Sequence, residues 1–422
     1  MALPHTMKCR LVEMIKRSLI YDVIYITLLI ACIFLSRGQY NYLLKFSLPS
    51  FNTTIICFVI ISMYLYLSNL RIGLYEGIFL MFFRYASVYP IVVFTLFYGT
   101  SLSPLVFSLL FYATTLFLLK IKFNKINLGW NKILSSRTMG VAMVGLMVSI
   151  LAVIFINNGL PSLAALNLVN IYEVRSEYKS SAMIALLQSF TTFFVVPFLI
   201  FKLKSKISLL IPISLSLIIF LSSGGKFIMA MCFVFLSLKF ILNNFSTKHL
   251  ALIFIGPTLC AIFLLNSEFK FIAHYLYFRP FMIPAWVTFE YFELSNVIEF
   301  YYYNDHFLTG LFNERISLPE TVGWQMYPES GSYVNAGAIG YSFINTGWFP
   351  LIEICFIVIV VKLFSHLGNN SLHLEDKHLV IALLVILGIY LGTTNILTAL
   401  KTRMFLAALV AMYFSIKRKR YE

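Results

Sequence analysis

Positively charged side chains stand near the ends of several apolar segments, where they could bind a phosphate group. They are, in chain order, Arg175, Lys226, Arg279, Lys401 and Arg403. Arginine offers a planar pair of donors and lysine a point charge, and both suit a phosphate or pyrophosphate. The same cations would stabilise a diphosphate leaving group as charge develops on it in a transfer reaction. The alternative for each residue is that its charge merely rises from a helix end to the membrane surface.

Two further groups of residues could take part in such chemistry. Aromatic side chains are dense between 268 and 337, and they could stack on sugars or form the aromatic belt of a membrane protein. Carboxylates and a histidine could act as a general base, although none of them stands in a diagnostic motif. They are Glu173, Glu177, Glu290, Glu293, Asp305 and His306.

The elements that position these residues are expected to be membrane helices. The chain has 422 residues, of which 60% are hydrophobic and 12% charged, whereas a soluble domain carries about 25% charged residues. Such a chain cannot cover its surface with polar groups in water. A helix needs about 20 apolar residues to cross a bilayer core, and the sequence supplies such runs repeatedly. We therefore expect an all-α, polytopic integral membrane protein in contact with the lipid bilayer.

The apolar runs predict about twelve transmembrane helices in a single domain, 1–422. Their ranges are 19–36, 51–69, 74–97, 102–120, 138–157, 182–201, 207–222, 227–243, 249–266, 338–361, 379–397 and 402–416. The two longest external connections run from about 157 to 181 and from about 268 to 337, the latter between the ninth and tenth helices. Within the second connection, the apolar periodicity of 284–303 favours a helix lying along the membrane surface.

The charge distribution predicts the orientation of these helices, because cytoplasmic loops are rich in Lys and Arg. With both termini in the cytoplasm, 21 of the 32 basic residues lie inside, ten lie outside and Arg84 lies within a helix. Six acidic residues lie inside, ten outside, and Glu353 within a helix. The cytoplasmic side then carries the whole net charge of +15 and the outer side is neutral. The basic balance thus reflects membrane insertion and gives no support for nucleic-acid binding.

Arg84 is the one cation that the prediction places near the middle of a helix. A charge at that depth is costly and usually faces the protein interior or a wet cavity. A structural ion pair, with Glu353 as the suggested partner, is favoured over a direct role in function.

The layout resembles the O-antigen polymerases, which polymerise oligosaccharide repeat units at the inner membrane of Gram-negative bacteria. The similarity covers the helix count, the large external loop in the C-terminal half, the element Tyr172-Glu173-Val174-Arg175, and the run from Asn335 to Phe349 that leads into the next helix. The resemblance implies a metal-independent glycosyltransferase with a GT-C-like fold and no cofactor, active at the periplasmic face. Members transfer a growing glycan from undecaprenyl pyrophosphate to the non-reducing end of an incoming undecaprenyl-pyrophosphate-linked repeat unit.

The same resemblance implies roles for individual residues. Arg175 is the foremost expected pyrophosphate contact, and Arg279 and Lys226 are expected to act with it in catalysis. Residues expected to bind pyrophosphate or sugar are Tyr172, Glu173, Arg315, Asn335, Tyr341, Lys401 and Arg403. The Arg-x10-Gly motifs of some members are absent here. A chain-length regulator and the O-antigen flippase are expected partners.

Two other functions stay open. An O-antigen ligase shares the fold and the donor but is expected to use an external histidine, and His274 and His306 stand in no recognisable context. A lipid-linked oligosaccharide flippase or another transporter is expected to carry polar groups along several helices. The predicted helices are largely uncharged beyond Arg84 and Glu353, which favours an enzyme whose chemistry lies at one surface.

Overall fold

A computed structural model describes residues 5–37, 48–68, 72–98, 101–121, 136–159, 178, 181–202, 209–223, 226–245, 247–295, 322–323, 336–402 and 405–415. The elements within these ranges are helices, and the ranges contain no β-strand. Six of the helices are long and apolar enough to cross a membrane: Leu19–Ser36, Leu74–Phe97, Ser103–Lys120, Thr138–Asn158, Met183–Lys202 and Leu351–Asn370. The prediction of an all-α membrane protein is confirmed at this level, and the count of twelve spans stays a prediction.

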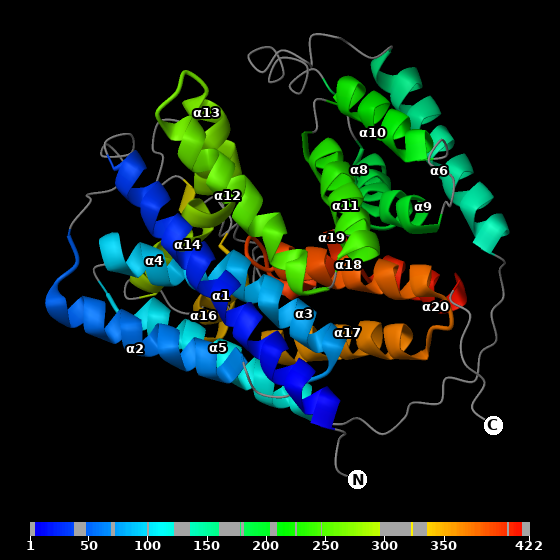
Figure 1. Ribbon diagram of the computed structural model, residues 1–422. Coiled ribbons are helices and arrows are strands. Elements are labelled where there is room, and N and C mark those ends of the chain that lie inside the picture. The colour runs from blue at the N-terminus through cyan, green and yellow to red at the C-terminus, as the bar shows by residue number, and fades with distance from the viewer. Residues whose placement is uncertain are drawn as a thin grey trace. The chain divides into compact units, whose positions relative to one another are not determined.

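The described residues group into two compact units. Unit 1 comprises Met1–Lys122, Ala251–Val361 and Val385–Leu397, and unit 2 comprises Phe123–Leu250, Lys362–Leu384 and Thr398–Glu422. The main helices of unit 1 are α1 (His5–Ser36), α2 (Phe51–Ser68), α3 (Leu74–Phe83), α4 (Tyr89–Phe97), α5 (Ser103–Lys120), α12 (Leu252–Leu265), α14 (Ile283–Leu294) and α16 (Ala338–Thr346). Unit 2 contains α6 (Ser136–Asn158), α8 (Ala182–Phe190), α9 (Val196–Lys202), α10 (Leu210–Ser223), α11 (Lys226–Asn244) and α20 (Phe405–Ser415). Helices α17 (Leu351–Asn370), α18 (Leu374–Tyr390) and α19 (Ile396–Thr402), which are labelled in Figure 1, contribute residues to both units.

The predicted helix 338–361 is wrong as a single element, because the chain breaks it into α16 and α17. Gly347 ends α16 with φ = 61°, a left-handed conformation that glycine adopts without a steric penalty. Pro350 directly precedes α17. Helix α17 then continues to Asn370, nine residues beyond the predicted end.

A second difference lies within the predicted external connection 268–337. Here the chain forms α13 (Lys270–Ala273), the π-helix η6 (His274–Met282) and α14 in direct succession. The predicted helix 284–303 is confirmed over 284–294, and 296–303 lie outside the described residues. The exposure of α14 is not that of a surface helix. Nine of its twelve residues are buried, because α14 packs against α4, α5 and α16. A helix that is apolar on nearly all sides is typical of a protein core.

In the part of the chain that the structure describes, three π-helices interrupt longer helices, and each ends two residues before a proline. They are η1 (Arg84–Val88) before Pro90, η3 (Thr191–Val195) before Pro197, and η6 before Pro284. A proline has no N–H, and its ring clashes with the carbonyl four residues earlier in an α-helix. In each case that carbonyl lies within the π-helix, whose wider turn relieves the clash. Pro257 in α12 is an exception and follows Gly256.

Two glycines of α18 and the turn after it let the chain approach η1 closely. A Cβ atom added to Gly392 would lie 2.8 Å from the Ala86 carbonyl oxygen, the group that Pro90 leaves without its usual donor. A Cβ atom on Gly388 would lie 2.9 Å from Cβ of Phe82. Small residues four apart are a common contact between membrane helices. They explain why this part of α18 packs against α3 and η1.

An ion pair joins α1 to η1 inside unit 1. Arg84 Nη2 donates to both carboxylate oxygens of Asp22 at 2.8 Å, and Nη1 donates to the Tyr112 hydroxyl at 3.2 Å. The guanidinium carbon also lies 5.5 Å from the ring centroid of Tyr89. Arg84 and Asp22 are 2% and 1% exposed. The charge on Arg84 is therefore compensated inside the protein.

The prediction of an ion pair for Arg84 is thus confirmed, but the suggested partner is wrong. Glu353 instead accepts a hydrogen bond from the backbone N–H of Ile396, the first residue of α19. The first N–H groups of a helix have no partner within the helix, and a buried carboxylate can supply one. Glu353 therefore stabilises the start of α19.

A second ion pair lies within unit 2. Lys202, the last residue of α9, pairs with Asp376 in the first turn of α18. Lys239 on α11 donates to the Ile200 carbonyl in α9. The predicted topology places both Lys202 and Asp376 at cytoplasmic helix ends, and two groups at one level can form such a pair.

We expect the Asp22→Asn variant to lose about 3–5 kcal/mol of stability, because it leaves the Arg84 charge buried without a counter-charge. The double variant Asp22→Asn/Arg84→Met should recover most of this loss, because it removes both charges. The measurement is the thermal unfolding of each purified variant in detergent. A single variant as stable as the wild type would contradict the role given to the pair.

Candidate functional site

The described residues include only some of the side chains that the sequence singles out. Tyr172, Glu173, Arg175, Arg315, Asn335 and Arg403 lie outside the described residues. Lys226 begins α11, and Lys401 lies in the last turn of α19, both within unit 2. Arg279 and Tyr341 belong to unit 1. The predicted convergence of the cations on one pyrophosphate stays a prediction.

Arg279 is exposed on the π-helix η6 and stacks on a neighbouring ring. Its guanidinium carbon lies 5.4 Å from the ring centroid of Tyr275. A guanidinium stacked in this way is held in place, while its N–H groups remain free to point outward in the plane of the guanidinium. Arg279 can therefore bind an anion such as a phosphate.

His274 lies one turn before Arg279 and packs against Phe278, with ring centroids 5.3 Å apart. Burial lowers the pKa of His274, and the positive charge of Arg279 lowers it further. The imidazole is therefore neutral at pH 7, because the ordinary histidine pKa is already about 6.5. At pH 7, Arg279 is therefore the positively charged side chain of η6.

Glu290 is a half-buried carboxylate on α14. Its Oε1 accepts a hydrogen bond of 2.7 Å from Trp286 Nε1, one helical turn earlier. Burial raises the pKa of Glu290, repulsion from Glu293 adds to this, and the Trp286 hydrogen bond opposes it. Glu293 is exposed on the same helix. The sequence marked Glu290 only as one base candidate among six, and its burial distinguishes it from Glu293.

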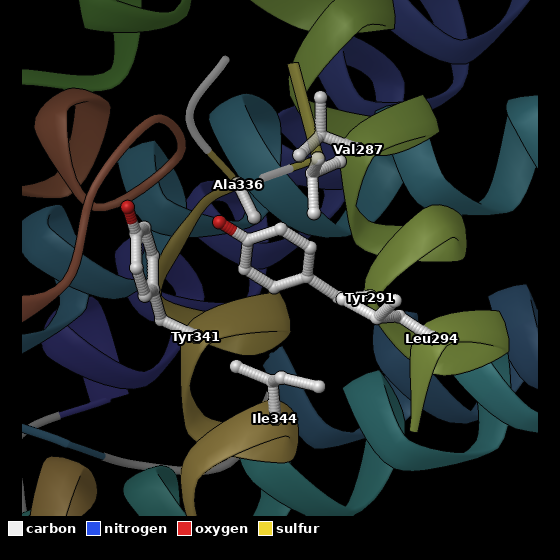
Figure 2. Packing of buried hydrophobic residues seen from close by; sticks show 7 residues of the cluster. Val287, Tyr291, Leu294, Ala336, Tyr341 and Ile344 are labelled. Carbon is white, nitrogen blue, oxygen red and sulfur yellow. The ribbon is translucent and has the colours of Figure 1, made fainter. Parts of the chain in front are cut away.

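Tyr341 is buried beneath α14 in the core of unit 1, with 3% of its surface exposed. Its ring meets that of Tyr291 edge to face, with centroids 5.5 Å apart. Figure 2 shows the two rings side by side, with Ala336 and Ile344 next to them. Phe343 of α16 stacks on Phe292 of α14 at 3.5 Å between ring centroids. Tyr341 thus contributes packing to the support of α14, and its contact with substrate stays a prediction.

Arg279 and Glu290 are the candidate functional residues along the continuous helical segment from η6 to α14 in unit 1, and we call this pair the η6–α14 face. η6 offers an exposed cation, and the largely buried helix α14 offers a carboxylate oriented by Trp286. Within the described part of the chain, no group of three His, Cys, Asp or Glu side chains is arranged to hold a metal ion. The arrangement can bind an anion and can accept a proton.

Comparison with known proteins adds no relative to this picture. No protein-family model, curated protein or solved structure matches the chain. The function is therefore inferred from the residues, the geometry and the resemblance in layout.

The predicted orientation places Arg279 outside and the α17–α18 turn inside. In a variant without native cysteines, Arg279→Cys should react with a membrane-impermeant maleimide added to spheroplasts. Leu374→Cys, at an exposed position that begins α18, should react only after the membrane is permeabilised. The reverse pattern of labelling would overturn the orientation.

Proposed function

We propose that the chain is an O-antigen polymerase of the bacterial inner membrane. It transfers a growing glycan from undecaprenyl pyrophosphate to the non-reducing end of an incoming lipid-linked repeat unit, on the periplasmic side. The fold is a GT-C-like arrangement of about twelve membrane helices. The single observation that carries the proposal is the layout: helix order, the Tyr172–Arg175 element, and the segment 335–349 that follows a large external loop.

The reaction forms one bond and breaks another at the same carbon. A hydroxyl of the acceptor sugar attacks the anomeric carbon of the donor glycan, and the bond to the pyrophosphate oxygen breaks. The leaving pyrophosphate takes the electron pair, and cations stabilise its charge. Arg175 is the foremost of these cations, with Arg279, Lys226, Arg315, Lys401 and Arg403 as further contacts.

The described structure favours an enzyme over a transporter. Arg84 and Asp22 compensate each other, and Glu353 bonds to the backbone of α19. These intramembrane charges therefore serve packing, whereas a translocation path needs polar groups that meet the cargo. The exposed Arg279 lies instead on a segment that is predicted to be external.

The ligase alternative rests on an external histidine. His274 packs against Phe278 and Tyr275 within η6, and His306 lies outside the described residues. A flippase remains the third candidate. Loss of each of these three activities leaves a different glycolipid.

Deletion of the gene therefore decides between them. Loss of a polymerase should leave lipid A core capped with one repeat unit. Loss of a ligase should leave uncapped core, and loss of a flippase should trap lipid-linked units on the cytoplasmic side. Gel electrophoresis of lipopolysaccharide, with analysis of lipid-linked sugars, separates the outcomes.

Within the polymerase proposal, Arg175→Ala and Arg279→Ala should shorten or abolish the O-antigen ladder at unchanged protein level. Removal of one donor to a developing oxyanion costs about 100-fold to 1000-fold in rate. Arg279→Lys should retain part of the activity, since it keeps the charge and loses the paired donors. A normal ladder from Arg175→Ala would refute the central assignment.

A further inference from the structure

Glu290 combines three features that a general base requires, namely a fixed orientation, access to solvent and a neighbourhood that favours proton uptake. The indole N–H of Trp286 holds Oε1 at 2.7 Å. Trp286 is itself buried, with 7% of its surface exposed, so the donor is fixed by packing. Glu290 is only half-buried, and a substrate can therefore reach the carboxylate.

The position of α14 places this carboxylate near particular helix ends. Phe289 and Phe292 flank Glu290 and contact Phe94 of α4 and Phe107 of α5, with ring centroids 4.9 Å and 5.6 Å apart. Helix α4 ends at Phe97 and α5 begins at Ser103. The predicted orientation puts both ends on the outer side of the membrane. Glu290 therefore lies at the level where the sugar of a lipid-linked pyrophosphate would stand.

Within the described ranges, the helices packed against α14 carry few charged residues. Helices α4 and α16 carry no Asp, Glu, Lys or Arg, and the one such residue of α5 is Lys120 at its last position. The titratable and charged groups on all elements packed against α14 are Tyr89, Tyr112, Lys120, His274, Tyr275, Tyr277, Arg279 and Tyr341. Burial and Glu293 both favour the protonated form of Glu290. Such a carboxylate accepts a proton more readily than an exposed one.

We propose that Glu290 is the general base that removes the proton from the acceptor hydroxyl. The proposal rests on the polymerase function given above. As the hydroxyl oxygen bonds to the anomeric carbon, its proton passes to the Glu290 carboxylate, and the pyrophosphate leaves with the electron pair of the broken bond. Trp286 is a positioning residue, because it orients Glu290 without contacting the reacting atoms.

The test compares membranes that contain wild-type protein, Glu290→Gln or Glu293→Gln at equal protein level. The substrate is the undecaprenyl-pyrophosphate-linked repeat unit extracted from the deletion strain. Glu290→Gln should lower the polymerisation rate at least about 100-fold, as expected for loss of a general base, with KM little changed. Glu293→Gln is the matched control, an exposed carboxylate on the same helix, and at a pH above the pKa of Glu290 it should polymerise at the wild-type rate.

The dependence of rate on pH separates catalysis from folding. The wild-type rate should fall as the pH drops through the raised pKa of Glu290. Trp286→Phe removes the hydrogen bond that lowers this pKa, so its acidic limb should move to higher pH, and a purely structural Trp286 would not shift it. A conservative variant, Glu290→Asp, should retain part of the rate, which shows that the helix still folds.

Each failure has its own signature. If wild-type membranes do not lengthen the glycan, the polymerase function is wrong. If they do, and Glu290→Gln lengthens it at the wild-type rate or Trp286→Phe leaves the pH dependence unchanged, only the assignment of Glu290 is wrong.

Discussion

Backbone N–H and C=O groups that face hydrocarbon have no water to bond, and this constraint governs the whole chain. Helices satisfy it within each segment, which is why the described elements are helical. Proline violates it locally, since it removes a donor. The chain places a π-helix before Pro90, Pro197 and Pro284, and near Pro90 it brings Gly392 close to the Ala86 carbonyl. The same packing fixes the end of α18 against α3 and η1.

Charged side chains obey the same constraint at higher cost. The Arg84 guanidinium is stable at its depth because Asp22, Tyr112 and Tyr89 surround it. The carboxylate of Glu353 meets the start of α19. Arg279 and Glu290, in contrast, are exposed and half-buried, respectively, and they lie at the margin of the apolar packing. The η6–α14 face thus lies at this margin, and the stacked rings of Phe292 and Phe343 support α14.

Hydropathy predicted the helices well where one apolar run forms one uninterrupted helix, as in α2, α5 and α6. It failed at 338–361, because hydropathy does not register the left-handed turn at Gly347. It also missed the burial of α14, because Tyr291 and two glutamates resemble a polar connection, whereas α4, α5 and α16 pack against the helix and bury nine of its twelve residues. Asp22 lies within the predicted helix 19–36 and is not among the residues singled out from the sequence. An acid within an apolar run is the signal that could have paired it with Arg84. Burial of Glu290 depends on tertiary packing, so the sequence could name it only as one candidate.

The π-helices also change how the sequence of a helix maps onto its surface. A π-turn contains about one residue more than an α-turn, so side chains beyond it are rotated by about 100° from their α-helical positions. A helical wheel drawn for Leu74–Phe97 therefore assigns residues after Val88 to the wrong side of the cylinder. A related chain with one residue inserted or deleted within Arg84–Val88 would have the side chains on one side of that change rotated. It would therefore share helix contacts on only the other side. η1 therefore sets the direction in which the side chains after it point in the interior of unit 1, whatever residues it is made of.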